Sequence, residues 1–204
     1  MSRVLVSSDK TSFLQRCDKT LVYQKILAKS SASLTINHSS TSLNSSMRIL
    51  GIDPGFDRTG WGVIDVIKNE FRWIGHGCIQ TSSKDDFTQR LQETRDGVKR
   101  IIEKAKPDLV VVEKLFFSSN AKTAINVGMG RGVILLAIAD AGIPMIELTP
   151  NQIKQAAAGY GGAKKDQIQE MVKRILKLDD IPKPDDAADA LAIAIAGSTM
   201  KSRE

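Results

Sequence analysis

Cysteine and histidine are scarce in this chain of 204 residues. The two cysteines, Cys17 and Cys78, cannot form a disulfide framework, so reducing surroundings are the default expectation. Neither His38 nor His76 has a cysteine or histidine beside it at the spacing of metal ligands. The pattern therefore predicts no zinc site.

Long apolar runs are also missing. No stretch approaches the roughly 20 apolar residues that span a bilayer, and we expect a soluble, cytoplasmic protein. The chain has no G-x-S-x-G motif, no histidine-paired cysteine and no Walker loop. Covalent catalysis by a side chain and P-loop nucleotide binding are therefore not indicated. The length and a hydrophobic content of 42% permit one domain with a real core.

Residues 1–46 lack glycine, proline and glutamate altogether, and twelve of them are serine. They hold six basic and two acidic residues, a net of +4 out of the total +6, so residues 47–204 carry +2. Such a leader can be an organelle transit segment. We favour a disordered tail or a misassigned start, because a strand pattern begins at once after Met47. We expect the folded domain to cover 47–204, and its mildly basic charge fits a nucleic-acid partner.

The pattern of the remaining chain alternates between strands and helices. Five segments read as strands: 48–53, 60–66, 71–81, 109–113 and 143–148. Five others read as helices: 86–106, 120–141, 150–158, 164–177 and 184–198. Short links between the first three strands predict antiparallel hairpins. The order predicts an α/β fold with a mixed five-stranded sheet and helices on both faces.

Four carboxylates stand at the ends of these elements. Asp53 and Glu113 close strand-like apolar runs, and Asp186 and Asp189 share one face of the last helix because they are three residues apart. If the first and fourth strands are parallel neighbours, their carboxyl ends meet. Carboxylates that converge repel one another unless a cation lies between them. Oxygen ligands of this kind suit Mg²⁺ or Mn²⁺, and two such ions would serve phosphodiester hydrolysis.

Plainer interpretations exist for each of these acids. Asp53 precedes a Pro-Gly turn and could be an Asx-turn residue, and Glu113 alone would be an ordinary strand end. Asp185 also shares a face with Asp189. We assign the helix cap to Asp185 and the metal to Asp186. Asp189 lies inside an Ala/Leu/Ile helix, where a carboxylate without a partner is costly.

Several motifs, in order along residues 47–198, resemble the RuvC family of Holliday junction resolvases. The segments that carry the resemblance are G-I-D-P-G at 51–55, T-G-W-G at 59–62, E-K-L-F at 113–116, R-G at 131–132, Q-I-K-Q at 152–155, G-A-K-K at 162–165 and D-A-A-D-A-L-A at 186–192. The resemblance implies an RNase H-like fold and a homodimer. It implies Mg²⁺-dependent paired nicks in two strands of like polarity at a four-way junction, in recombination and repair. It also implies partnership with a RuvA–RuvB branch-migration complex.

The resemblance also implies roles for individual residues. Asp53, Glu113, Asp186 and Asp189 match the catalytic, metal-binding carboxylates of the family. Phe116 matches an aromatic residue that stacks on bases, although Phe117 could equally be the stacking ring. Lys154 and Lys165 match positions that contact the DNA backbone.

Arg131 is a further candidate for DNA binding. It lies among Gly128, Gly130 and Gly132, which are poor helix formers. Something must therefore approach closely there: a packed helix, a dimer mate or DNA.

Two other functions compete with this interpretation. An actin-like phosphotransferase also has Asp, Gly and Thr after its first strand, as at Asp53, Gly55 and Thr59, but it needs a second phosphate loop that is not evident here. A junction-binding protein without cleavage is the other alternative. Acids that face DNA without a catalytic use would only weaken binding, which argues against it.

Overall fold

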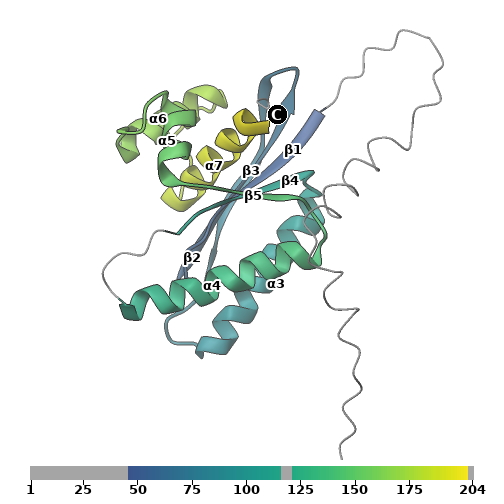
Figure 1. Ribbon diagram of the computed structural model, residues 1–204, viewed down its shortest axis with the longest axis vertical. Coiled ribbons are helices and arrows are strands. Elements are labelled where there is room, and N and C mark those ends of the chain that lie inside the picture. Colours follow the sequence, from purple (N-terminus) through teal and green to yellow (C-terminus); the bar gives the residue numbers. More distant parts are fainter. Residues whose placement is uncertain (1–45, 116–120, 202–204) are drawn as a thin grey trace, which may run out of the picture. The chain divides into compact units, whose positions relative to one another are not determined.

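Five strands form one mixed sheet in the computed structural model, which describes residues 46–115 and 121–201 (Figure 1). The strand order is β3-β2-β1-β4-β5. The strands are β1 (Ser46–Asp53), β2 (Arg58–Ile67), β3 (Glu70–Gln80), β4 (Leu109–Glu113) and β5 (Met145–Leu148). The first three are antiparallel, whereas β4 runs parallel to β1 and β5 parallel to β4. The predicted mixed sheet is confirmed.

The five helices begin and end within a few residues of the predicted boundaries. They are α3 (Phe87–Ala105), α4 (Ala121–Asp140), α5 (Pro150–Ala158), α6 (Lys165–Ile175) and α7 (Asp185–Lys201). A capping box fixes the start of α5, because the Thr149 hydroxyl accepts from the Gln152 amide while the Gln152 side chain accepts from the Thr149 amide. Across the described ranges, no helix is long and apolar enough to cross a membrane.

Two separate cores lie on opposite faces of the sheet. Leu50 and Ile52 of β1 pack with residues of α3 and α4, whereas Ile49 packs with residues of α5, α6 and α7. Side chains alternate between the two faces along a strand. Asp53 therefore shares its face with Ile49, and by the same alternation Glu113 shares its face with Leu109 and Val111. Figure 1 shows α7 on this face and α3 and α4 on the other.

Glycines allow α7 to lie directly on the sheet. A Cβ atom at Gly51 would lie 2.1 Å from the carbonyl oxygen of Ala190, and one at Gly60 would lie 2.0 Å from that of Asp186. Neither glycine could become alanine without a shift of backbone. The closely packed part of α7 contains small residues, and Ala187 and Ala188 are fully buried. This close approach fixes where the acids of α7 lie.

Candidate functional site

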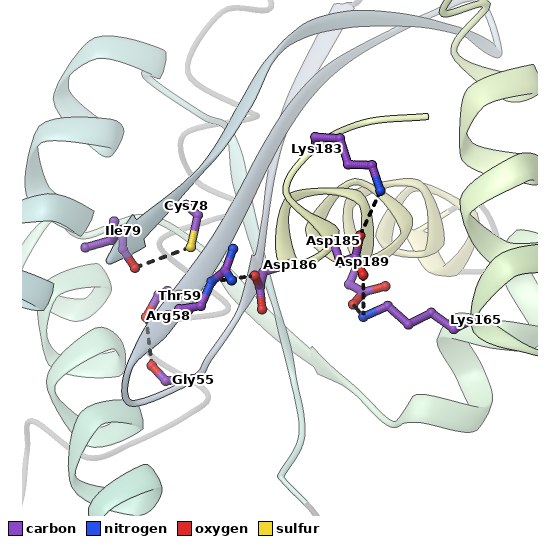
Figure 2. A network of polar contacts seen from close by, with 10 residues as sticks. All are labelled: Gly55, Arg58, Thr59, Cys78, Ile79, Lys165, Lys183, Asp185, Asp186 and Asp189. Carbon is purple, nitrogen blue, oxygen red and sulfur yellow. Dashed lines mark hydrogen bonds and ion pairs between the residues drawn. The ribbon is translucent and has the colours of Figure 1, made fainter. Parts of the chain in front are cut away.

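The strand register places Asp53 beside Glu113. Ile52 of β1 pairs with Val112 of β4 in parallel register, so the next residues, Asp53 and Glu113, lie side by side at the carboxyl ends of the two strands. Their side chains point toward the face that α7 covers. The turn after Asp53 is held by buried Thr59, whose hydroxyl donates to the carbonyl oxygen of Gly55 at 2.9 Å (Figure 2).

The start of α7 brings the other two acids to the same end of the sheet. Gly60 is the register partner of Asp53, and the backbone of Asp186 rests on Gly60. Asp189 is one helical turn further on and lines a cavity of about 220 Å³ together with Glu113. The predicted meeting of strand ends and helix is therefore confirmed.

The electrostatics of the site show how close these charges are. Burial and the neighbouring charges of Glu113, Asp189 and Asp186 raise the pKa of Asp53 to about 7. Burial, followed by the charge of Asp189, also raises the pKa of Glu113, although a hydrogen bond with Asp53 and the charge of Lys154 oppose this. The positive charge of Lys165 opposes the rise in the pKa of Asp53, but burial and the negative charges outweigh it.

Two basic side chains hold the acids of α7. Arg58 Nε lies 3.0 Å from Asp186 Oδ2, and Lys165 Nζ lies 2.9 Å from Asp189 Oδ2. Figure 2 shows the two aspartates directed to different sides, each toward its cation. Among the residues that the structure describes, no three or more acids, cysteines or histidines are arranged to hold a metal ion. Because Asp186 and Asp189 each pair with a side-chain cation, the sharing of one ion by all four carboxylates stays a prediction.

The donor chemistry nevertheless fits a hard divalent cation. Four carboxylates supply only oxygen ligands, which Mg²⁺ and Mn²⁺ prefer. Burial and then the neighbouring negative charges raise the pKa of Asp53, and a bound cation would offset those charges. Asp53 and Glu113 lie side by side, and Asp189 lines the same cavity as Glu113.

Asp185 has a different environment from Asp186 and Asp189, the other two acids of α7. It is the first residue of α7, and its carboxylate lies 3.3 Å from Lys183 Nζ and 3.9 Å from Lys165 Nζ. The structure therefore places it in the first helical turn, among lysines, where negative charge also complements the helix dipole. We predicted it as the residue that precedes the helix and caps it.

Both predicted DNA-binding lysines lie at the site. Lys154 of α5 and Lys165 of α6 line the cavity that also holds Glu113 and Asp189. Acids and cations thus share one opening.

The remaining predicted contacts lie elsewhere. Arg131 of α4 pairs with Glu147 of β5, and its side chain is only 15% exposed. Its role in DNA binding stays a prediction, and the contact to Glu147 was not foreseen. Phe116 and Phe117 lie outside the described residues.

Sequence reasoning also missed Arg58. The sequence did contain one signal for it. Arg58 lies two residues before Gly60 on β2, and residues two apart on a strand point to the same face of the sheet. The pair with Asp186 follows once Gly60 is known to lie under α7. Arg58 also hydrogen-bonds Cys78, whose pKa is raised, chiefly by burial.

Comparison with known proteins identifies the family. The model of the family "Crossover junction endodeoxyribonuclease RuvC" matches residues 49–197. The chain belongs to the RuvC family. The match begins within β1 and ends within α7, so it includes every element that carries a candidate acid.

Relatives in this family share about half of the aligned residues. The RuvC protein of Brevibacillus brevis is 49% identical over 156 residues, which cover 76% of this chain and 94% of the relative. That of Chloroflexus aurantiacus is 52% identical over 149 residues, which cover 73% of this chain and 91% of the relative. The structure of T. thermophilus RuvC in complex with Holliday junction substrate matches with a TM-score of 0.71 at 32% identity, covering 77% of this chain and 96% of that one. The RNase H-like fold is thereby confirmed.

Proposed function

We propose that the chain resolves four-way DNA junctions in recombination and repair. It acts as a structure-specific endodeoxyribonuclease that makes paired nicks in two strands of like polarity, using Mg²⁺ or Mn²⁺. The observation that carries the proposal is the family match, which spans the whole sheet and the acids at its edge. Family membership argues against the actin-like phosphotransferase.

Asp53, Glu113, Asp186 and Asp189 are the residues that we propose hold the metal ions, two in each site. The bound ions would lower the pKa of an attacking water and stabilise charge on the leaving 3′ oxygen. Asp53 and Glu113 come from neighbouring strands and form the rigid part of the site. Asp186 and Asp189 come from α7, which is fixed by its contacts with Gly51 and Gly60.

The lysines of α5 and α6 orient the DNA in this proposal. Lys154 and Lys165 line the same cavity as Glu113 and Asp189, and Lys165 pairs with Asp189. Their ammonium groups can neutralise the phosphates that flank the cleaved bond, without reading the base sequence. Phe116 is proposed to stack on a base at the junction centre.

A homodimer is the proposed functional unit, because two symmetric nicks need two sites. Helix α4 supports this. Ile125, Met129 and Leu136 are 59%, 50% and 58% exposed, and their spacing of four and seven residues places them on one helical face. Between them, a Cβ at Gly128 or Gly132 would contact nothing within 4 Å. This exposed apolar face with two small positions suits close packing against the same helix of a second copy.

The sequence left open what approaches the glycines of α4, and the structure shows this for Gly130. A Cβ at Gly130 would lie 3.3 Å from the ring of Phe56, so this glycine makes room for the turn after β1. Gly128 and Gly132 are the two that remain open for a dimer mate.

Two further proposals rest on the family alone. We propose that a RuvA–RuvB branch-migration complex delivers the junction. We also propose that residues 1–46 are an extension that the nuclease domain, residues 47–204, does not need. A chain that begins at Met47 should then fold and cut like the full chain.

The deciding experiment is cleavage of a synthetic four-way junction, with each strand end-labelled in turn. We expect symmetric nicks in two strands of like polarity with Mg²⁺, and none in linear duplex. Asp53→Asn and Asp189→Asn should bind the junction without cutting it. Asp96→Asn is the matched control, since Asp96 is an exposed aspartate on α3.

Two results would contradict the proposal. Cleavage by the asparagine variants at the wild-type rate would remove the carboxylates from catalysis. A wild-type chain that binds the junction but never cuts it, with Mg²⁺ or Mn²⁺, would favour a junction-binding protein instead.

A further inference from the structure

Arg58 is a basic residue at the site. Neither the family motifs nor the proposed function gives it a role. It stands at the start of β2, with its guanidinium Nε 3.0 Å from Asp186 Oδ2 (Figure 2). Its side chain is 44% exposed and that of Asp186 29%. The contact is therefore open to solvent and can break without disturbing the core.

One strand positions both parts of Asp186. Gly60 receives the backbone of Asp186, and Arg58, two residues earlier on the same face of β2, receives its carboxylate. The aspartate is thereby directed toward β2, whereas Asp189 is directed toward Lys165 of α6. One oxygen of each carboxylate is therefore paired with a side-chain cation, for which a metal ion beside Asp53 would compete.

We propose that Arg58 is a positioning residue that holds Asp186 in the ion-free protein and competes with the divalent cation for it. This inference rests on the proposed function. The guanidinium forms an ion pair with Oδ2, one of the two carboxylate oxygens that could serve as a ligand. Mg²⁺ demands ligands at about 2.0–2.1 Å in near-octahedral geometry, so a guanidinium and the ion cannot share that oxygen in the same direction.

Arginine suits this role because it stays charged at every relevant pH. It offsets negative charge among the four acids while no ion is bound, and metal binding has to break the pair. A solvent-exposed ion pair is weak. Loss of the pair should therefore tighten metal binding by only about 2–5-fold.

The test is a titration of the full chain with Mn²⁺ alone, without DNA, followed by electron paramagnetic resonance of the unbound ion. Arg58→Gln should bind Mn²⁺ about 2–5-fold more tightly than wild type. Arg95→Gln is the matched control, because it removes the same charge from an exposed pair with Asp96 on α3. It should bind Mn²⁺ as wild type does.

A double-mutant cycle separates competition at Asp186 from a general effect of charge. In an Asp186→Asn background, Arg58→Gln should no longer change Mn²⁺ affinity, because the carboxylate for which the two cations compete is gone. A gain that persists in that background would overturn the inference.

Unchanged Mn²⁺ binding by Arg58→Gln would also overturn the inference. Weaker binding would overturn it too, because it would show that Arg58 prearranges Asp186 for the ion. Should Arg58→Gln fail to fold in a thermal melt, Arg58→Met keeps the aliphatic stem and is read by the same criteria. The proposed function fails separately, if the wild-type chain binds no Mn²⁺ at all.

Discussion

The proton on Asp53 gives a prediction that can be worked out in detail. Burial and three neighbouring carboxylates raise its pKa from 3.8 to about 7. In the unfolded chain these neighbours are dispersed, so the ordinary value applies. Between pH 4 and pH 7, roughly, the folded chain then binds one proton more than the unfolded chain does.

The sign of the effect follows from this difference. Stability falls with rising pH wherever the folded state binds more protons, so the site destabilises the fold as the pH rises through this window and no further above it. A shift of about three units at about 1.4 kcal/mol per unit gives an upper limit of about 4 kcal/mol. Asp53→Asn removes the charge and should remove most of this loss.

The assay is urea unfolding at pH 5, 6, 7 and 8 in the presence of a chelator. The advantage of Asp53→Asn over wild type in free energy of unfolding should be smallest at pH 5, where about a third of the window has been crossed. At pH 8 the variant should be more stable by about 2–4 kcal/mol. Asp96→Asn should follow the wild-type curve, because the Arg95 hydrogen bond lowers the pKa of Asp96 and keeps it ionised.

Mg²⁺ provides a second arm of the same experiment. At pH 8 it should raise the stability of wild type, since a ligand that binds only the folded state stabilises it. It should have much less effect on Asp53→Asn. Parallel pH curves for wild type and Asp53→Asn would refute the reasoning, because they would mean that Asp53 is not crowded by negative charge.

Three further predictions concern DNA, packing and assembly. Lys154→Ala and Lys165→Ala should each weaken junction binding and lower the salt dependence by about one unit of slope, and an unchanged slope would remove that lysine from the interface. Gly60→Ala should destabilise the fold by about 1–3 kcal/mol or more and abolish cleavage by displacing α7, whereas Gly161→Ala, whose Cβ would meet nothing within 4 Å, should melt like wild type. Leu136→Glu should convert a dimer into a monomer in light scattering, and a dimer that persists would exclude this face of α4.

The strands and the acids at their ends could be predicted from the sequence, because their signals are local. The apolar runs that end at Asp53 and Glu113 gave both strands, and the expected parallel pairing followed from the order of elements. The shared face of Asp186 and Asp189 needed only helical geometry.

The partners of the acids could not be predicted in the same way. The contact of Arg58 with Asp186 depends on how closely α7 lies on β2, and that distance is set by Gly60. The pairing of Arg131 with Glu147 likewise joins α4 to β5 across a tertiary contact that leaves no periodic signal in the sequence. Family motifs identify positions along the chain, but they do not show which side chains form ion pairs.

The central claim is that acids from β1, β4 and α7 gather around a divalent cation. Its most direct test is the Mn²⁺ titration of wild type, Asp53→Asn and Glu113→Gln, with Asp96→Asn as control. We predict that wild type and the control bind Mn²⁺ alike, and that both site variants lose at least one bound ion. Binding curves for the site variants that coincide with wild type would contradict the claim.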